Sequence, residues 1–121
     1  MFTCLHQSTY CEKKSRFLVY VYSLDGEEDF KQILDKLQEE NPKARHFLRC
    51  GRFANRYGVM STTFSEDREP VSSMHRLSQL MERKKIENRA VFLVRYFGGT
   101  KLGASHLDSV YFDLAVPILK L

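Results

Sequence analysis

The spacing of apolar residues divides the first half of the chain into a strand, a helix and a hairpin. Residues 17–22 are apolar at every position, which is typical of a strand buried on both faces. Between residues 30 and 37 the apolar positions recur at intervals of three and four, which predicts a helix with one buried face. We expect Asp25 to cap this helix and Asn41-Pro42 to end it. Residues 46–53 and 57–64 then form two strands joined by a turn.

The second half of the chain predicts a helix, a strand and a further helix. A polar loop over residues 65–73 leads to a helix whose apolar face lies at residues 77–81. Residues 90–94 are all apolar and predict a second buried strand. The last helix is expected to begin with Ser105 as its cap and to run to about Val116. Its buried positions are Leu107, Val110, Tyr111 and Leu114.

This order of elements predicts an α+β fold, with one four-stranded sheet and helices mainly on one face. Residues 1–12 show no period and are expected to form an irregular lead or a short edge strand. The other face of the sheet would be bare and would carry part of the stretch 45–56. Because the chain has 121 residues, we expect a single domain over residues 1–121.

The composition, 43% hydrophobic and 28% charged residues, is that of a soluble globular protein. No apolar run approaches the roughly 20 residues of a membrane-spanning helix, and the N-terminus lacks the pattern of a signal peptide. We therefore expect a cytoplasmic protein with no membrane partner. The three cysteines, Cys4, Cys11 and Cys50, are an odd number, which favours free thiols in a reducing compartment.

Charges are separated along the chain, although the net charge is only +4. Residues 23–40 contain seven acidic residues, whereas residues 41–64 contain five basic residues and no acid. This asymmetry predicts one acidic and one basic surface, and a basic surface is typical of proteins that bind RNA. Alternatively, the arginines lie along strand edges without a partner.

The sequence offers few candidates for a metal site or for catalysis. The Cys-x-His-x4-Cys stretch at residues 4–11 does not have the spacing of a zinc site, which needs four ligands. Asp67 and Glu69 could form an acidic pocket that does acid–base work or binds Mg²⁺. Alternatively, they hydrogen-bond to the backbone of their loop or pair with Arg68. We expect no metal, no cofactor and no catalytic residue.

The strand at residues 90–94 runs into the glycine-rich stretch 94–103, Val-Arg-Tyr-Phe-Gly-Gly-Thr-Lys-Leu-Gly. A strand, a glycine turn and a helix start direct several backbone N–H groups to one place, which together with Lys101 makes a candidate anion site. The stretch matches neither the phosphate loop of nucleotide hydrolases nor the dinucleotide-binding pattern. Alternatively, the glycines only let the loop turn tightly against the sheet.

This stretch resembles the V-R-Y-F-G-G-T-K-L-G signature of the IMPACT N-terminal domain family at ten consecutive positions. Lys-Lys-Ser-Arg-Phe at residues 13–17 and Ala-Arg-His at residues 44–46 are similar to two further family motifs. Asp67, Glu69 and Pro70 fit a D-D-G-E-P motif in part. The resemblance covers nearly the whole chain, with its motifs in the family's order.

The resemblance implies a ribosomal protein S5 domain 2-like fold, which also occurs in domain IV of elongation factor G and in kinases of the galactokinase superfamily. It further implies a role in translation control, because IMPACT proteins of eukaryotes restrain a kinase of translation initiation. The chain is similar to a divergent, single-domain member. It departs from the family pattern at Arg68, which replaces a glycine, at residues 71–75, and at residues 105–109, where Asp108 is gained. We expect these bulkier side chains to narrow a family pocket.

Our first hypothesis is a non-catalytic binding module of the IMPACT type, linked to translation regulation through RNA or a ribosome-associated protein. The residues expected to contact nucleic acid or phosphate are Lys13, Lys14, Arg16, Arg45, Arg49, Arg52, Arg95, Gly98, Gly99, Thr100 and Lys101. A second hypothesis is an enzyme or phosphate-binding protein that uses residues 98–101 opposite Asp67 and Glu69. A third is a scaffold that acts through dimerisation or protein contacts alone.

Overall fold

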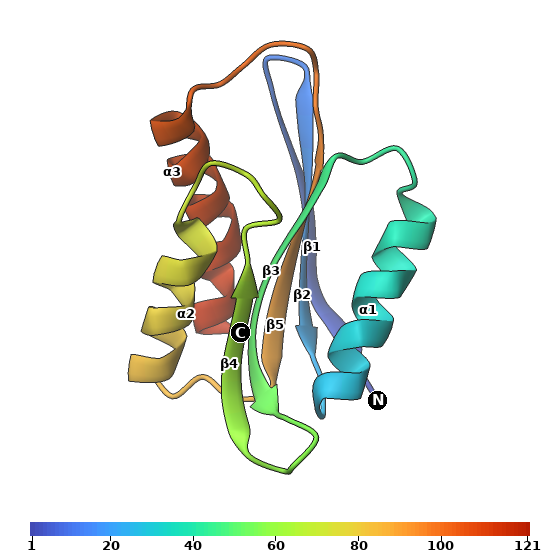
Figure 1. The fold of residues 1–121 in the computed structure, drawn as a ribbon, viewed down its shortest axis with the longest axis vertical. Helices are drawn as coiled ribbons and strands as arrows, with labels where there is room; N and C mark the ends of the chain where they lie inside the picture. Colours follow the sequence, from blue (N-terminus) through green and yellow to red (C-terminus); the bar gives the residue numbers. More distant parts are fainter.

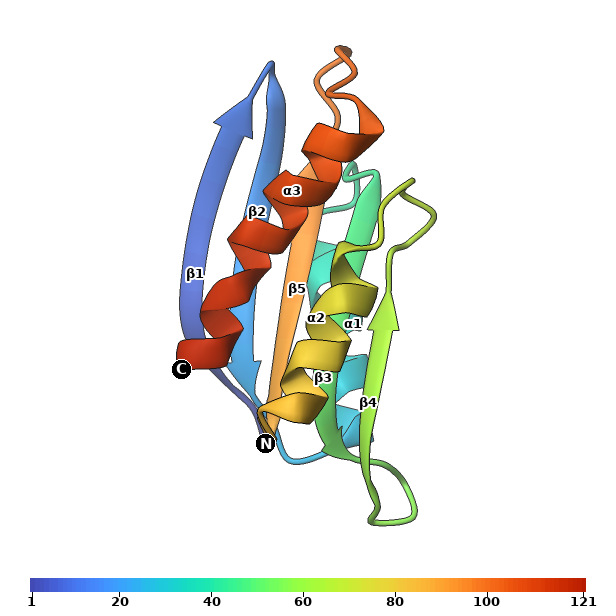
Figure 2. The same cartoon turned by 90° about the vertical axis from the view of Figure 1, so that its left-hand side faces the viewer.

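The computed structural model describes all residues from 1 to 121. Its elements are, in chain order, β1 (Thr3–Glu12), β2 (Ser15–Ser23), α1 (Glu27–Glu40), β3 (His46–Ala54), β4 (Met60–Ser65), α2 (Ser73–Arg83), β5 (Arg89–Tyr96), α3 (Ala104–Ala115) and the 3-10 helix η1 (Val116–Lys120). The strands form one antiparallel sheet in the order β1-β2-β5-β3-β4. Helix α1 lies on one face of the sheet (Figure 1), and α2 and α3 lie side by side on the other (Figure 2).

The α+β class is confirmed, but the predicted number of four strands is wrong. Residues 1–12 are not an irregular lead, because most of them form the full edge strand β1, which pairs with β2 along its length. Most residues of β1 are exposed whichever face they point to, so the strand has no apolar period by which it could be recognised. Lys13 and Lys14 join β1 to β2, both at positive φ (46° and 68°), as a two-residue type I′ hairpin turn requires.

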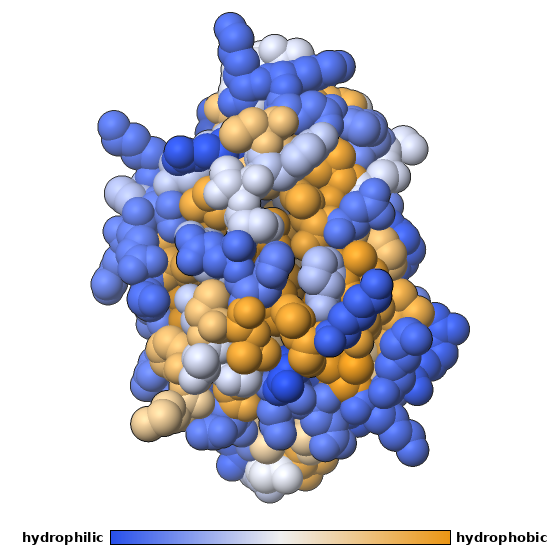
Figure 3. All heavy atoms as spheres, turned by 180° about the vertical axis from the view of Figure 1, so that it is seen from behind, coloured by the Kyte–Doolittle hydropathy of each residue, from blue (hydrophilic) through white to orange (hydrophobic).

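Apolar side chains remain on the surface beside the edge strand β1. Seen from that side, hydrophobic atoms show through in the middle of the molecule, between hydrophilic side chains (Figure 3). Leu5 and Tyr10 are the large apolar residues of β1 that are exposed. None of the helices combines the length and the apolar character that crossing a bilayer requires.

The sheet carries a hydrophobic core on each face, because successive residues of its central strands point to opposite sides. On one side, Phe17 and Leu93 belong to the core that α2 and α3 cover. On the other side, Phe92 packs in a second core with Ile33 and Leu37 of α1. Two of the three helices share a face, as predicted. The opposite face is not bare, however, and this expectation is wrong, because the apolar side of α1 covers β3 and β5.

The starts of α1 and α3 differ from the predicted ones. Gly26 precedes α1 and Gly103 precedes α3, so neither Asp25 nor Ser105 is a cap, and no side chain caps either helix. Near α1, the carboxylate of Asp29 accepts the backbone N–H of Asp25 at 2.9 Å. At α3, by contrast, no side chain bonds to the first N–H groups of the helix.

The carboxylate of Glu66 caps the start of α2 from the preceding loop. It accepts the backbone N–H of Met74 at 3.1 Å and that of His75 at 2.9 Å. These bonds satisfy two of the N–H groups that a helix start leaves without partners. They also fix the position of the loop that follows β4.

Glu66→Ala should lower the free energy of unfolding by about 0.5–2 kcal/mol, the usual cost of losing a helix cap. Chemical denaturation followed by circular dichroism measures the change. Glu82→Ala is the matched control, because Glu82 is an exposed residue of α2 without a polar side-chain contact. If both variants lose the same stability, Glu66 does not act as a cap.

Candidate anion-binding site at the glycine loop

Three strand ends and two loops meet at one end of the sheet. The strand register places the starts of β2 and β3 beside the end of β5, with His46 opposite Arg95. Two loops complete this end (Figure 1): the glycine loop, residues 97–103, and the acidic loop, residues 66–72. Segments that are far apart in the sequence thus contribute side chains to one place.

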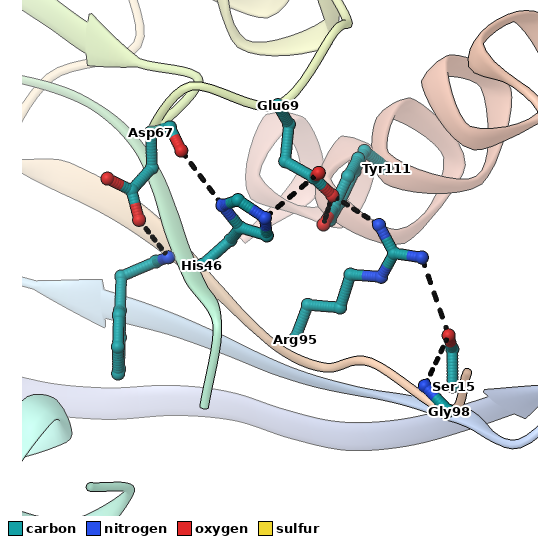
Figure 4. Close-up of polar contacts among 8 residues, drawn as sticks. Ser15, His46, Asp67, Glu69, Arg95, Gly98 and Tyr111 are labelled. Carbon is teal, nitrogen blue, oxygen red and sulfur yellow. Dashed lines mark hydrogen bonds and ion pairs between the residues drawn. The ribbon is translucent and has the colours of Figure 1, made fainter. Parts of the chain in front are cut away.

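The carboxylate of Glu69 joins these segments. Its Oε2 atom accepts one hydrogen bond from Nη1 of Arg95 and one from the hydroxyl of Tyr111, both at 2.6 Å. Its Oε1 atom lies 3.1 Å from Nε2 of His46 (Figure 4). The side chains of Glu69 and Arg95 are each only 6% exposed. A buried ion pair is tolerated only when further hydrogen bonds satisfy its atoms, and the hydroxyl of Tyr111 provides one.

The ring of His46 lies between Asp67 and Glu69 of the acidic loop. Its Nδ1 atom is 2.9 Å from the backbone oxygen of Asp67, while Nε2 faces Glu69. Both ring nitrogens face oxygens, and both can donate when the ring is protonated. The carboxylate of Asp67 accepts the backbone N–H of Phe47 at 2.7 Å. Asp67 and Arg68 turn the chain at positive φ (48° and 65°). Asp67 thus binds the backbone, as one of the two alternatives for this loop predicts.

Tyr111 contributes both an apolar ring and a polar hydroxyl to this end. Its ring packs edge-on against Phe17, with 5.4 Å between the ring centres. Burial raises the pKa of Tyr111 well above its usual value, and the hydrogen bond to Glu69 raises it further. The folded state therefore holds the neutral phenol, which can donate to the carboxylate.

The glycine loop packs directly on the turn between β1 and β2. A Cβ atom at Gly98 would lie 2.1 Å from the carbonyl carbon of Lys14, so only glycine fits there. The N–H of Gly98 donates to the buried hydroxyl oxygen of Ser15 at 3.3 Å. Nη2 of Arg95 lies 3.4 Å from the same oxygen (Figure 4). The loop is thereby linked to the ion pair of Glu69 and Arg95.

A pocket of about 430 Å³ opens between the glycine loop, the acidic loop and the start of α3. Glu69 and Arg95 form part of its wall, and the exposed residues Arg45 and Lys101 also line it. The guanidinium groups of Arg45 and Arg95 lie 5.7 Å and 5.4 Å from the centre of the Phe97 ring. The first turn of α3 adds uncapped N–H groups and contains no acid. The pocket is therefore electropositive, because Arg95 balances the charge of Glu69.

The departures from the family pattern scarcely touch this pocket. Neither Arg68 nor any of residues 71–75 lines it, and of residues 105–109 only Leu107 does. Asp108 pairs with Arg76 of α2 and accepts the backbone N–H of Ser72 at 2.8 Å. The replaced residues other than Leu107 therefore lie outside the wall of this pocket.

The predicted contact residues fall into three groups. Five exposed cations lie at this end of the sheet and form no ion pair: Lys13, Lys14, Arg16, Arg45 and Lys101. The second group is Arg95 in the pocket wall, with Gly98, Gly99 and Thr100 in the loop that follows it. The third group lies elsewhere on β3. Arg49 donates to the backbone oxygen of Phe47 at 2.9 Å, and Arg52 lies at the far end, 3.6 Å from Glu87.

Three residues of the site, Ser15, His46 and Tyr111, have no role in the sequence-based hypotheses. Ser15 and His46 lie within the family-like stretches 13–17 and 44–46, and this is the signal by which they could be found. Tyr111 is recognisable only as an apolar position of a helix. Its partner Glu69 is 42 residues away in the chain, so the pattern around Tyr111 carries no sign of it.

Gly98→Ala should lower the free energy of unfolding by about 1–3 kcal/mol, because the added methyl group overlaps the backbone of the turn. Thermal or chemical denaturation measures the loss. Thr100→Ala, at an exposed position of the same loop, should leave stability nearly unchanged. A Gly98→Ala protein of unchanged stability would show that the loop does not pack against the turn.

Tyr111→Phe should weaken the loss of stability at alkaline pH. The phenol ionises near pH 10 in the unfolded chain, whereas its pKa is raised in the folded chain, so stability falls as the pH rises above about 10. The variant should be less stable at pH 7 by about 1.5–3 kcal/mol, because Glu69 loses a hydrogen bond. Denaturation between pH 7 and about 11 tests both effects. Tyr57→Phe, at a position that is 74% exposed, is the control. An equal alkaline slope in wild type and Tyr111→Phe would contradict the assignment.

Comparisons with known proteins place this arrangement in a family. The sequence profile described as the Impact N-terminal domain matches residues 13–119. An IMPACT family member of Haemophilus influenzae is 34% identical over 111 residues, which cover 90% of this chain and 53% of that protein. The IMPACT family member YigZ of Escherichia coli is 35% identical over 101 residues, which cover 82% of this chain and 49% of that protein. The chain spans about half the length of these relatives.

Two solved structures share the fold. One, described as a hypothetical protein, aligns with a TM-score of 0.80 and 24% identity over 98% of this chain and 59% of that chain. The other is the two-domain translational regulator Yih1, with a TM-score of 0.50 and 22% identity over 97% of this chain and 46% of that chain. Since the family profile matches all but the first 12 and the last two residues, the chain belongs to the Impact N-terminal domain family.

Proposed function

We propose that this chain is a non-catalytic binding module that acts in translation regulation, and that its basic end contacts RNA. In this proposal residues 1–121 form one binding domain. In this proposal the side chains around Glu69 hold the loops in place through their contacts with one another.

The five exposed cations at the glycine-loop end carry this proposal. Lys13, Lys14, Arg16, Arg45 and Lys101 come from three separate segments of the chain, yet they gather where β2, β3 and β5 meet. The carboxylates nearby are engaged with other groups: Glu12 with His106 and Tyr10, Asp67 with the N–H of Phe47, Glu69 with Arg95, and Asp108 with Arg76. A surface with unpaired positive charge attracts the phosphates of nucleic acids.

The family supports the link to translation. Yih1, which shares the fold, is described as a translational regulator. Membership of the family makes a regulatory role the natural starting point for this chain. RNA is the partner whose charge complements the basic end, and a ribosome-associated protein is the partner that remains if RNA does not bind.

Binding to a short single-stranded RNA should weaken as salt is added and should depend on the basic end. Removing two lysines, as in Lys13→Gln/Lys14→Gln, should weaken binding and reduce the slope of log K against log salt by about 0.7 for each phosphate that the protein no longer neutralises. Filter binding at several salt concentrations measures both quantities. The matched control is Lys31→Gln/Lys36→Gln, which removes the same charge from exposed positions of the acidic helix α1.

An affinity that does not change with salt, or no binding at low salt, would exclude RNA as the partner. Equal weakening in both double variants would show that net charge matters and the basic end does not. Circular dichroism of each variant verifies that the fold is intact.

The pocket favours a second candidate, a protein that binds or converts a small phosphorylated molecule through residues 98–101. Its volume of about 430 Å³ lies within the range of small-molecule sites, and Lys101 lines it. This candidate differs from the first because a nucleotide or a sugar phosphate would bind in the absence of any RNA.

A further inference from the structure

We propose that the pocket holds a phosphate monoester, the doubly charged terminal phosphate of an RNA strand or of a small phosphorylated molecule. The inference rests on the proposed function in one respect: it takes the basic end to be a phosphate-binding surface. It adds that this surface binds a phosphate monoester in preference to an internal phosphodiester.

The size of the pocket favours a terminal group. A pocket of about 430 Å³ has room for one nucleotide-sized ligand but not for a duplex. Residues of the glycine loop, the acidic loop, the start of β3 and the start of α3 line it. An internal phosphodiester continues into a sugar on both sides and therefore needs a groove that is open at two ends. A phosphate monoester continues on one side only.

The donors around the pocket also suit a group with three free oxygens. Lys101 and Arg45 are exposed, line the pocket and form no ion pair. The uncapped N–H groups in the first turn of α3 supply a third direction, and the helix dipole favours negative charge there. A phosphodiester has only two free oxygens and one charge. A monoester has three oxygens and nearly two charges at pH 7, so it can accept from all three sources.

A buried donor without an acceptor lies in the same wall. Nε of Arg95 is the single buried side-chain nitrogen or oxygen of the chain that has no hydrogen-bond partner, whereas Nη1 and Nη2 contact Glu69 and Ser15. This observation is independent of the helix start and of the exposed cations. It shows that the chain leaves one N–H of the Arg95 guanidinium without an acceptor, in a side chain that forms part of the pocket wall.

Negative groups near the pocket do not oppose an anion. Glu69 is the carboxylate in the wall. It is paired with Arg95 and accepts a hydrogen bond from the hydroxyl of Tyr111. Asp108, the acid gained relative to the family pattern, pairs with Arg76 and does not line the pocket. The positive charges of Arg45 and Lys101 are therefore left uncompensated.

Titrations of an eight-nucleotide RNA with a fluorophore on an internal base test the proposal, with the strand carrying a 5′-phosphate, a 3′-phosphate or hydroxyl groups at both ends. Fluorescence anisotropy gives each dissociation constant. One phosphorylated form should bind at least about tenfold more tightly than the hydroxyl form, since charge-assisted hydrogen bonds distinguish them. Lys101→Gln should reduce this ratio to about twofold or less, because it removes one of the charge-assisted donors.

Lys13→Gln/Lys14→Gln should weaken the binding of all three strands by the same factor. Lys31→Gln is the matched control for Lys101→Gln. Adenosine monophosphate and inorganic phosphate, added as competitors, distinguish an RNA end from a small phosphorylated molecule.

The outcomes separate this inference from the proposed function. Equal affinity for the three strands overturns the inference, while binding of RNA as such stands. A ratio that persists in Lys101→Gln also overturns it, because the discrimination then arises outside the pocket. No binding of RNA, together with thermal stabilisation by adenosine monophosphate that Lys101→Gln abolishes, excludes RNA as the partner and supports the monoester site. If neither the strands nor the mononucleotide bind, both the inference and the proposed function are wrong.

Discussion

The buried carboxylate of Glu69 is the interaction on which one whole end of this molecule depends. It accepts hydrogen bonds from Arg95 of β5 and Tyr111 of α3, and it faces His46 of β3. Removing one partner of a buried ion pair typically costs about 3–5 kcal/mol, because the remaining charge has no compensation. The acidic loop, two strands and a helix are therefore held in one arrangement. Arg95 extends the connection through Ser15 to the glycine loop.

This pairing also explains how the end can be positive on its surface and contain a carboxylate in its interior. The charge of Glu69 is balanced inside by Arg95, so the exposed lysines and arginines around the pocket have no acid to neutralise them. The other acids nearby form ion pairs that join neighbouring elements. Glu12 contacts His106 at 2.6 Å and so ties the end of β1 to α3, while Asp108 ties α3 to α2. The exposed cations at this end can contact a ligand, because the nearby carboxylates are already paired with other groups of the protein.

The elements that the sequence predicts well are those with a strong apolar pattern. The strand at residues 90–94 is buried on both faces, and the helix at residues 30–37 presents a clear apolar side. The strand at residues 17–22 forms as predicted, but only one of its faces is fully buried, because Leu18 and Tyr20 on the other are half-buried. For residues 1–12 the sequence predicts either an irregular lead or a short edge strand, and the full length of β1 is not predicted because the strand is held by backbone pairing with β2 and not by buried side chains. The sequence also does not predict that Gly26 and Gly103 precede the helices α1 and α3, since the polar residues nearby do not act as caps.

The site shows the same division. Arg45, Arg95 and Lys101 can be found from charge and from the family-like stretches, and all three line the pocket. The network around Glu69 cannot be found in this way, because its contacts join residues separated by 23 to 42 positions, and the link to Ser15 spans 80. Arg49 and Arg52 fit the charge pattern equally well, but the register of β3 carries them away from this end. Residue type identifies the cations, and only the fold decides which of them converge.

Backbone amide shifts recorded by ¹H–¹⁵N NMR during a titration with adenosine monophosphate test most directly whether this end binds phosphate. The amides of the glycine loop and of the first turn of α3 should shift together and saturate, while those of α1 stay unchanged. Shifts that are absent at saturating ligand, or that are confined to α1 and the far end of the sheet, would contradict a phosphate site at the glycine loop.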